Sequence, residues 1–355
     1  MAPMKNFLPV PNIESARSFL YQTSWFFQRP LFNVLRHLRR RNVGRDDADG
    51  LWDWSSSETK DGPCLFGSAA SDLIRTRLLD EKPFMAARFG NTEIDTILPY
   101  HLRSKGNFLR KSIEFVRGTL PYFWWEYNTL RRMMRDSGFF PLDKRHLEHF
   151  CRLMLNDIRE IDVLGSWLNK EKYLADIMCK PIRVPYHDFL PFQHVDPWTA
   201  ALEGKVVLVI HPFAETIESQ YKNKRRRLFK NRKILPVFEL KTLKAVQTVA
   251  GTRPPPGMET WFDAYHSMAA AVERIKFDIA IIGCGAYGLP LAAHVKRLGK
   301  KSVHLAGMTQ ILFGIKGARW DKKAMIADLY NESWVSPSPA ETPKQFKQME
   351  DGCYW

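Results

Sequence analysis

Seven short apolar runs, separated by stretches with helical spacing, constrain the fold of this chain more than any other feature. The runs lie at residues 84–89, 163–167, 182–186, 206–210, 234–240, 277–282 and 302–305, and each has the composition of a β-strand. Helical periodicity falls between them, at residues 69–80, 92–102, 145–160, 214–230, 260–275 and 287–298. Strands that alternate with helices form a mostly parallel sheet with helices on both faces. The sequence therefore predicts an α/β, Rossmann-like fold.

The first 60 residues differ in character from the rest. Residues 19–41 combine large aromatic side chains with a basic end, and a polar connector leads to Gly62. We expect Pro30 to break any single long helix there. Two interpretations stay open, a helical appendage packed on the body or a segment lying on an anionic membrane surface. The expected organisation is an N-terminal basic and aromatic extension with linker at 1–62, a Rossmann-type catalytic domain at 63–340 and a C-terminal tail at 341–355.

Positive charge dominates the composition. The chain of 355 residues has a formal net charge of +15, and eight of the thirteen residues at 221–233, YKNKRRRLFKNRK, are Lys or Arg. Such an excess implies an acidic partner, which could be nucleic acid, lipid head groups or the phosphates of a small ligand. The run has neither zinc-finger spacing nor an RNP-type aromatic strand, so we expect no specific nucleic acid. It is either a solvated helix face or a contact for phosphate or an anionic membrane.

Targeting signals and cysteine usage bear on location. The five cysteines are an odd number without paired spacing, which argues against a disulfide framework or a zinc site. No apolar run approaches 18 residues, and the N-terminus lacks signal-peptide order. We expect a cytoplasmic protein, with peripheral contact to a membrane as an open alternative.

A glycine turn, GCGAYG at 283–288, follows the sixth apolar run and opens a helical stretch. Glycine lets the backbone approach a phosphate, whose charge then lies at the N-terminus of the next helix. A NAD site also needs an acid roughly 20 residues further on. The next apolar run leads instead into Ala306, Gly307 and Met308, so hydride chemistry on NAD is disfavoured. The turn either binds another phosphate-bearing ligand or serves only helix packing.

Polar residues at other strand ends are further candidates, because open parallel sheets bind ligands beyond their carboxyl edge. In AARFGNTEID, Arg88 ends a strand, and Glu93 and Asp95 begin a helix. This pattern suits an anion together with a metal or an acceptor hydroxyl. The alternative is helix capping by Asn91 or Thr92.

Two later stretches have the same character. His211 ends the run VVLVIH, and Glu215 lies in the following helix. His211 is therefore a base, a hydrogen-bond donor to a phosphate or a structural group. The stretch MTQILFGIKGARWD brings Gln310 near Arg319 and Trp320, a cation beside a stacking aromatic ring. This second group is equally suited to anchoring a loop.

Two motifs carry a resemblance to a known family. RFGNTE at 88–93 resembles the R-[FY]-G-x-x-E motif of the GT-D fold glycosyltransferases, a group once catalogued as a domain of unknown function. Residues 281–320 are similar to the C-terminal block of related polysaccharide-locus proteins, and the likeness covers about 65–340. It implies a Rossmann-like sheet that binds a nucleotide-diphosphate sugar and transfers the sugar to an acceptor hydroxyl, in surface polysaccharide or glycoconjugate synthesis.

The resemblance also implies roles for individual residues. Better-known members have an Asp-x-Glu pair at the donor and metal site, whereas this chain has Asn91 and keeps Glu93, one charge fewer for Mn²⁺ or Mg²⁺. Glu93 is the expected metal ligand or base, with Asp95, His211 and Glu215 as further candidates for the base. The expected donor-binding residues are Arg88, Gly90, Asn91, Gly283, Gly285, Ala286, Tyr287, Gly288, Gln310, Arg319 and Trp320.

Two other functions stay open. One is a Rossmann-type enzyme that uses NAD or S-adenosylmethionine through the same glycine turn. The other is a non-enzymatic protein that binds an acidic polymer or a membrane through residues 19–41 and 221–233.

Overall fold

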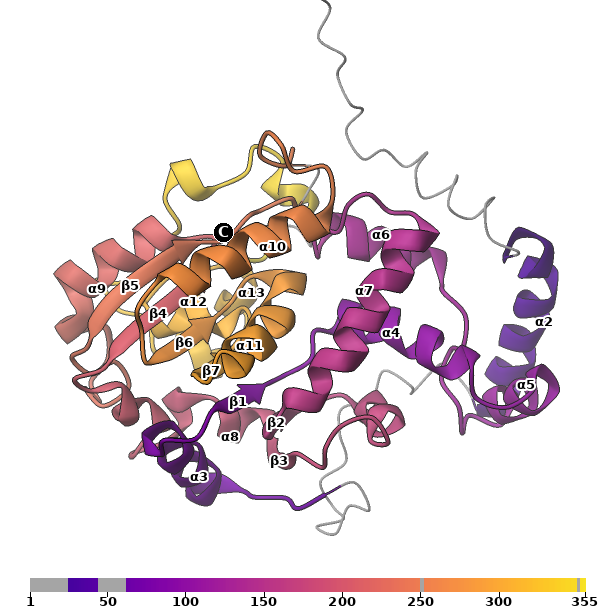
Figure 1. The fold of residues 1–355 in the computed structure, drawn as a ribbon, viewed down its shortest axis with the longest axis horizontal. Coiled ribbons are helices and arrows are strands. Elements are labelled where there is room, and N and C mark those ends of the chain that lie inside the picture. Colours follow the sequence, from indigo (N-terminus) through magenta and orange to yellow (C-terminus); the bar gives the residue numbers. More distant parts are fainter. Residues whose placement is uncertain (1–24, 44–61, 250–251, 350–351) are drawn as a thin grey trace, which may run out of the picture.

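A seven-stranded parallel sheet forms the centre of the protein (Figure 1). The computed structural model describes residues 25–43, 62–249, 252–349 and 352–355. The strand order is β3-β2-β1-β7-β6-β4-β5, and every neighbouring pair is parallel. This confirms the predicted α/β, Rossmann-like fold. The strands are β1 (Phe84–Ala87), β2 (Val163–Ser166), β3 (Ile182–Pro185), β4 (Val206–His211), β5 (Glu239–Lys244), β6 (Ile279–Ile282) and β7 (Lys301–His304).

Side chains of the central strands alternate between two hydrophobic cores. Met85 and Ala87 face one core, whereas Phe84 and Ala86 face the other, and β4 and β6 divide in the same way. Strands buried on both faces read as unbroken apolar runs, which is why they were visible in the sequence. The first core contains α4 (Asn91–Arg103), α7 (Lys144–Asp157), α10 (Trp261–Arg274) and α11 (Gly288–Arg297). The second contains α3 (Gly67–Leu79), α8 (Tyr186–Phe189), α9 (Ala214–Leu228) and α12 (Met308–Leu312).

The helices begin where local capping chemistry places them. Thr260 caps α10 and exchanges hydrogen bonds with Asp263, the pattern of a capping box. Asp143 caps α7 by accepting the backbone N–H of His146 at 2.9 Å. The predicted helices at 69–80, 92–102, 145–160, 214–230, 260–275 and 287–298 all occur, within a few residues of their predicted ends. The last turn of the third is the 3-10 helix η2 (Ile158–Glu160).

One predicted strand is displaced. The run at 234–240 was expected to pair, but β5 begins at Glu239 and ends at Lys244. Ile234, Leu235 and Phe238 are instead buried in the second core, and Pro236 has no N–H to donate to a ladder. The real strand is a charged edge strand, so its apolar content was too low to mark it.

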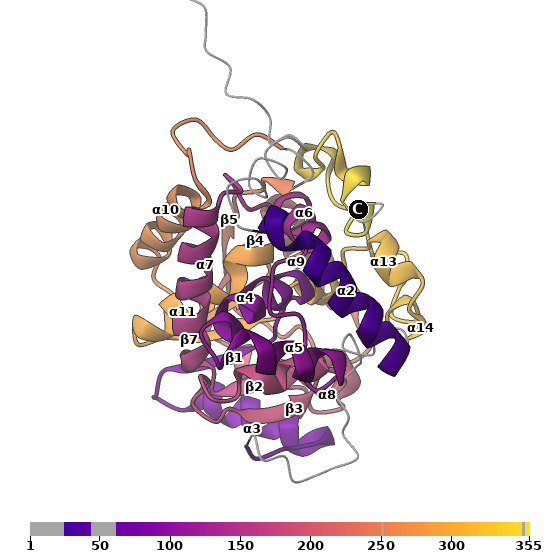
Figure 2. The ribbon, with the colours of Figure 1, turned by 90° about the vertical axis from the view of Figure 1, so that its right-hand side faces the viewer.

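The N-terminal helix α2 (Trp25–Val43) is continuous through Pro30, so the expected break there is wrong. It packs against α5 (Phe108–Val116), a helix that the sequence did not single out (Figure 2). Phe32 stacks on Trp124 at a ring separation of 4.3 Å, and this tertiary contact holds the helix beyond the proline. Residues 1–24, the first part of the expected extension, lie outside the described residues. Among the helices that the structure describes, none has the length and apolar character needed to cross a bilayer.

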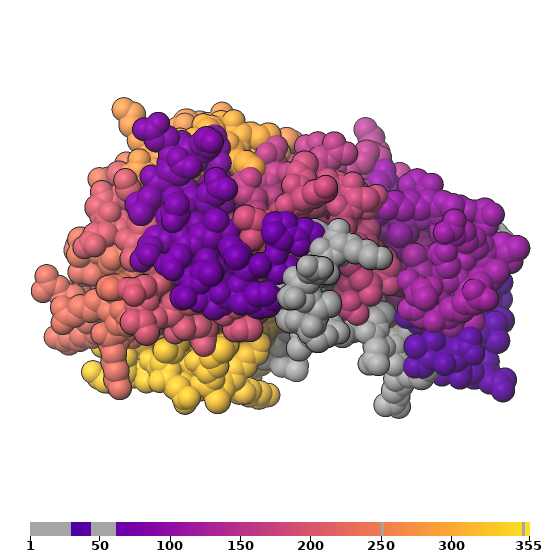
Figure 3. All heavy atoms as spheres, turned by 90° about the horizontal axis from the view of Figure 1, so that it is seen from below, coloured from indigo at the N-terminus to yellow at the C-terminus, as the bar shows by residue number. Residues whose placement is uncertain are grey.

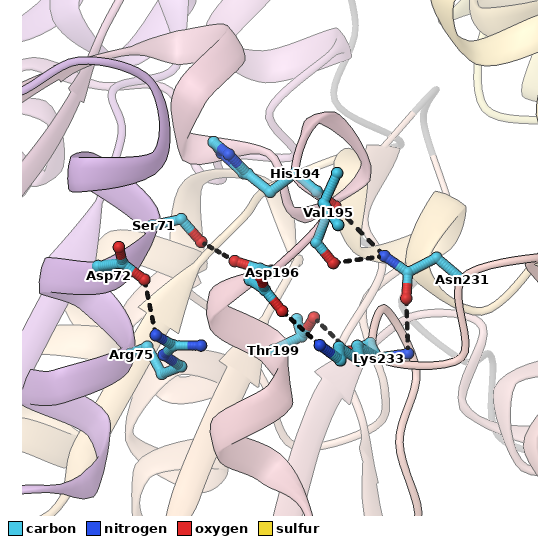
Figure 4. Close-up of polar contacts among 9 residues, drawn as sticks. All are labelled: Ser71, Asp72, Arg75, His194, Val195, Asp196, Thr199, Asn231 and Lys233. Atoms are coloured by element: carbon cyan, nitrogen blue, oxygen red, sulfur yellow. Dashed lines mark hydrogen bonds and ion pairs between the residues drawn. The ribbon is translucent and has the colours of Figure 1, made fainter.

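The basic run at 221–233 forms the end of α9 and the loop after it. Part of its charge is structural (Figure 4). Lys233 forms an ion pair with Asp196, and Asn231 donates to the carbonyl of Val195 at 2.8 Å. Ser71 of α3 donates to the carbonyl of Asp196 at 3.0 Å. Asp196 thus connects α3 with Lys233 of the basic run. The run is therefore partly a tether between surface segments and partly an exposed helix face.

A fully buried ion pair organises the loop that follows β2. Arg183 of β3 lies 3.3 Å from Glu171 of the 3-10 helix η3 (Asn169–Leu174), and neither side chain is exposed. Glu171 also accepts the backbone N–H groups of Trp167 and Leu168. Burial raises the pKa of Glu171, against the opposing effect of Arg183. The pair thus fixes the turn that carries Trp167 to the carboxyl edge of the sheet.

We expect Arg183→Met to lower the free energy of unfolding by about 3–5 kcal/mol, because it leaves the Glu171 carboxylate buried without its cation. The loss should be larger at pH 8 than at pH 5, since the carboxyl group can take up a proton at low pH. Urea denaturation at the two pH values measures both effects. Adding Glu171→Gln should restore part of the stability, and a single variant within 1 kcal/mol of the wild type would contradict this account.

Candidate functional site

A cleft of about 760 Å³ lies over the carboxyl ends of the central strands. The chain leaves β1 and β6 toward the first core and leaves β4 and β7 toward the second. Since the order of these strands is β1-β7-β6-β4, the loops of each neighbouring pair diverge and leave a crevice between them. Arg88, His211, Gly283 and His304 directly follow or end these strands, and all four line the cleft.

Arg88 is the central cation of the cleft. Its guanidinium lies 5.2 Å from the ring centre of Trp167 and 5.4 Å from that of Tyr186, so two aromatic faces hold it. Its Nη1 donates to the carbonyl of Phe89 at 3.1 Å, while its Nε is buried with no hydrogen-bond partner among the described residues. Within the described part of the chain Arg88 forms no ion pair. An anionic ligand would satisfy this charge.

Glu93 lies in the same cleft at the start of α4. Its Oε1 accepts a hydrogen bond from Ser137 at 2.9 Å. Burial raises the pKa of Glu93, while Ser137 and Arg88 act in the opposite direction. A Cβ at Gly90 would lie 1.9 Å from Oε2 of Glu93, so glycine is required there for the carboxylate to fold back into the cleft. A carboxyl group with a raised pKa suits general-base chemistry near neutral pH.

The capping alternative for this segment does not hold. The N-cap position of α4 is Gly90, and no side chain caps the helix. Asn91 is instead the first residue of α4 and lines the cleft, and its Oδ1 is buried without a partner among the described residues. Asn91, Thr92 and Glu93 therefore line the cleft, and none of their side chains caps the N-terminus of α4.

Asp95 and Glu215, two of the residues considered for the base, do not line the cleft. Asp95 forms ion pairs with Arg132, at 2.9 Å, and with Lys170. Glu215 is exposed and lies 2.8 Å from Lys244. Each carboxylate is paired with a cation outside the cleft, so neither is placed to act on a ligand in it.

Two neutral histidines flank the cleft. The backbone N–H of Phe213 donates to Nδ1 of His211 at 3.0 Å, which leaves the proton of His211 on Nε2. Nδ1 of His304 lies 3.2 Å from the carbonyl of Ile282, and since a carbonyl only accepts, this Nδ1 carries the proton. Burial lowers the pKa of each imidazole to about 3. His211 is therefore too weak a base to take a proton from an acceptor hydroxyl.

The glycine turn has two separate physical roles. A Cβ at Gly283 would lie 2.4 Å from the carbonyl of Ala306, and one at Gly288 would lie 2.1 Å from Cε1 of His304. These two glycines allow the turn and α11 to pack closely. Gly285 has φ +56°, with no atom nearer than 3.8 Å to a Cβ placed there, and it lines the cleft. Close packing thus explains Gly283 and Gly288, whereas Gly285 faces the cleft in a conformation that favours glycine.

The other predicted residues of the turn line the cleft as well. Ala286 and Tyr287 are both buried in the 3-10 helix η7 (Gly285–Tyr287). Tyr287 stacks on Trp261 with a ring separation of 4.7 Å. The thiol of Cys284 is buried, which raises its pKa and excludes a thiolate nucleophile at neutral pH.

The far wall of the cleft comes from the C-terminal third of the chain. Nη1 of Arg319, in α13 (Ala318–Asp321), donates to the hydroxyl of Tyr354 at 3.0 Å, and the guanidinium lies 4.8 Å from the ring centre of Tyr354. Lys323 lies 5.2 Å from the ring centre of Trp320. Burial, with Arg319 and Arg88 nearby, lowers the pKa of Lys323. These cations meet at one cleft although they are far apart in sequence.

Gln310 combines an anchoring role with an unsatisfied atom. Its Nε2 donates to the carbonyls of Ile315, Lys316 and Tyr354, so the residue does anchor the loop. Its Oε1, like Nε1 of Trp320, is buried without a partner among the described residues. Both residues line the cleft, and buried polar atoms without partners are rare unless a ligand or water completes them.

Sequence reasoning missed several residues that line the cleft. They come from the ends of β2, β3 and β7, from the loop after α6 (Tyr127–Arg135), from the segment after α13 and from the C-terminus: Ser137, Trp167, Tyr186, His304, Lys323, Tyr354 and Trp355. The one available signal was a position at or near the carboxyl end of a predicted strand, which applied to Trp167, Tyr186 and His304. Nothing local marked the others.

Carboxylates for a metal are few. Within the described ranges, no three or more His, Cys, Asp or Glu side chains are grouped so that they could hold a metal ion. Glu93 would therefore supply only part of a coordination sphere, and its hydrogen-bond partner is the hydroxyl of Ser137. The protein residues alone do not fit a dedicated Mn²⁺ or Mg²⁺ site.

Comparisons with known proteins returned matches only among solved structures. No protein-family model matches the sequence, and the search of curated proteins gave no significant match. Two solved structures match with 13% identity and a TM-score of 0.35, covering 88% of this chain and 98% and 97% of theirs. One is described as a selenomethionine-substituted structure of domain of unknown function 1792, the other as showing that this highly conserved domain has a distinct glycosyltransferase fold.

The second description names the group that the motifs at 88–93 and 281–320 resemble. A TM-score of 0.35 is too low to support a conclusion about activity. The fold assignment of this chain rests on its own strand order and pairing.

We expect Glu93→Gln to raise the melting temperature at pH 8. The folded-state pKa of Glu93 lies above its ordinary value of 4.5. At pH values between these two pKa values, the folded protein therefore binds more protons than the unfolded chain. Stability attributable to this group therefore falls as pH rises from 4.5 through the folded pKa. Melting curves between pH 5 and 8 should show the advantage of the variant shrinking as pH falls. A variant less stable than the wild type at pH 8 would contradict the raised pKa.

We expect substitutions at Gly288 and Gly285 both to lower stability, for different physical reasons. Gly288→Ala should cost about 1–3 kcal/mol by overpacking against His304. Gly285→Ala should cost about 1–2 kcal/mol, because a side chain disfavours its φ. Gly204→Ala is a matched control, with φ +69° and no atom within 4 Å of a Cβ. Chemical denaturation should give similar losses for Gly285→Ala and Gly204→Ala, and a neutral Gly288→Ala would refute the packing role.

Proposed function

We propose that this protein is a glycosyltransferase that moves a sugar from a nucleotide-diphosphate donor to a hydroxyl of a glycan or glycoconjugate. The observation that carries the proposal is Arg88, a cation without an ion-pair partner among the described residues, at a strand end in a large cleft and beside a carboxyl group of raised pKa. The resemblance of RFGNTE to the glycosyltransferase motif adds to it from the sequence.

The donor's diphosphate is assigned to the cationic side of the cleft. Arg88, Arg319 and Lys323 supply positive charge there, and the pKa of Lys323 responds to both arginines. As the bond to the sugar breaks, negative charge grows on the leaving phosphate, and fixed cations in a partly dry cleft stabilise that charge. Aromatic rings at Trp167, Tyr186 and Trp320 offer faces on which a base or a sugar can stack.

Glu93 is assigned as the general base. The acceptor oxygen attacks the anomeric carbon, its proton passes to the Glu93 carboxylate, and the bond between that carbon and the phosphate oxygen breaks. The products are the new glycoside and the nucleoside diphosphate. Ser137 holds Oε1 of Glu93 in place, and the raised pKa improves the carboxylate as a proton acceptor. A divalent ion would have to take most of its ligands from the diphosphate itself.

We expect a nucleoside diphosphate or its sugar to bind the wild type and raise its melting temperature. At 100 times its dissociation constant, the ligand should add about 2.7 kcal/mol to the free energy of unfolding. Arg88→Met should weaken this binding about 10- to 100-fold, since it removes charge-assisted hydrogen bonds. Arg75→Met, whose arginine pairs with Asp72 on α3, is the matched control. The ligands to compare are the UDP, GDP, TDP and CMP sugars, NAD and S-adenosylmethionine, each with and without Mn²⁺.

Release of nucleoside diphosphate from the donor that binds tests the chemistry. Glu93→Gln should bind the donor nearly as well as the wild type and reduce transfer about 10²- to 10⁴-fold. Stabilisation by NAD or S-adenosylmethionine alone would replace this proposal with a cofactor-dependent enzyme. Stabilisation by none of the ligands would leave a non-enzymatic, polyanion-binding protein as the better account.

A further inference from the structure

Exposed apolar side chains are concentrated at one end of the molecule. Of the 14 large hydrophobic residues that are exposed in the described structure, seven belong to α2 and α5. These two helices together hold only 28 residues, 19 in α2 and 9 in α5. They lie side by side, at the end opposite to α9 (Figures 1 and 3). We call this the α2–α5 surface, formed by Leu31, Val34, Leu38, Val43, Phe108, Leu109 and Ile113.

The fold holds α2 firmly while leaving this face open. Phe32 and Leu35 are buried in the first core, and Arg39 donates to the carbonyls of Phe115 and Leu120. On a different face of the same helix, Leu31, Val34 and Leu38 are 45%, 54% and 42% exposed. Their spacing, i, i+3 and i+7, makes a continuous stripe along the helix. The stripe is therefore a fixed feature of the surface.

Helix α5 has the same division. Lys111, Ser112 and Phe115 point inward, whereas Leu109 is 69% exposed and Ile113 is 44% exposed. Two apolar stripes on adjacent helices place more exposed apolar surface at one end of the molecule than the scattered single residues normal for a soluble protein, and we call this region the patch.

The rim of the patch is strongly basic. Helix α2 contains no acidic residue, and Arg40, Arg41 and Arg117 are exposed and form no ion pair in the described part of the chain. The single acid of α5, Glu114, pairs with Arg110 at 2.8 Å. Beside α5 is a hollow of about 600 Å³ whose lining includes Lys172 and Lys180, together with Lys105, which pairs with Asp176 at 2.6 Å. Apolar side chains surrounded by cations match the two layers of an anionic bilayer, acyl chains beneath phosphate head groups.

We propose that the α2–α5 surface docks the protein on a bilayer that contains anionic phospholipid. Leu31, Leu38, Leu109 and Ile113 enter the boundary between head groups and acyl chains, and Arg40, Arg41 and Arg117 contact lipid phosphates. The basic face of α9 does not take part, since it lies at the other end of the molecule. The inference is independent of the proposed function, because the surface shares no residue with the cleft.

Flotation of the full chain with vesicles tests this surface. Wild-type protein should float with vesicles of phosphatidylcholine and phosphatidylglycerol and should not float with phosphatidylcholine alone. The four-site variant Leu31→Gln, Leu38→Gln, Leu109→Gln and Ile113→Gln should bind at least tenfold more weakly. Arg40→Gln with Arg41→Gln should weaken binding about 20- to 30-fold and reduce its dependence on salt. All these positions are exposed, so melting temperatures should stay near the wild-type value.

Two matched control variants exclude general effects of polarity and charge. Leu79→Gln with Val195→Gln removes exposed apolar groups elsewhere, and Arg226→Gln with Arg227→Gln removes charge from α9. Both should float like the wild type. Loss of flotation in the α9 variant, or equal flotation of the α2–α5 variants and the wild type, would overturn the proposal. A further result would also overturn it: the wild type does not bind vesicles and instead forms a dimer, and the four-site variant does not form this dimer.

Discussion

Parallel pairing of all seven strands is the constraint on which the rest of the structure depends. It brings every carboxyl end to one edge of the sheet, so residues as distant in sequence as Arg88 and His304 end neighbouring strands. It also requires a covering segment between successive strands, and these segments build the two cores. The alternate exits of β1, β7, β6 and β4 toward opposite faces then open the cleft.

The cleft combines charges that would be unstable together without a ligand or strong packing. Arg88, Arg319 and Lys323 are drawn close enough to influence one another, and aromatic rings take up much of their surface. Nearby, Glu93 is held in a partly buried position where its charged form is disfavoured. Sites that bind anions or move protons commonly accept such a loss of stability. Outside the cleft, the carboxylates of Asp95 and Glu215 are each paired with a cation.

The buried pair of Arg183 and Glu171 shows how structural charge supports the cleft from outside it. Neither residue lines the cleft. Glu171 orders the turn that begins at Trp167, and Trp167 in turn donates its indole N–H to the carbonyl of Phe89 at 2.9 Å, beside Arg88. The orientation of the central cation therefore depends on an ion pair at the next two strands. At the other end of the molecule, α2 is fixed by stacking and by Arg39, while the apolar side chains of Leu31, Val34 and Leu38 stay exposed.

The sequence by itself determined the strands whose side chains are buried on both faces, the helices between them and the turn at 283–288, because each has a local signature in apolar periodicity or glycine spacing. It did not identify β5, whose charged edge has no such signature, or the continuity of α2 through Pro30, which depends on packing against Trp124. Only the tertiary structure decided which polar residues meet. Glu93 and Asp95 are two residues apart, yet one enters the cleft and the other pairs with Arg132, because a helix turns successive side chains to different sides. Lys323 and Tyr354 joined the site without any local signal, since their distance from Arg88 is set by the folding of the whole sheet.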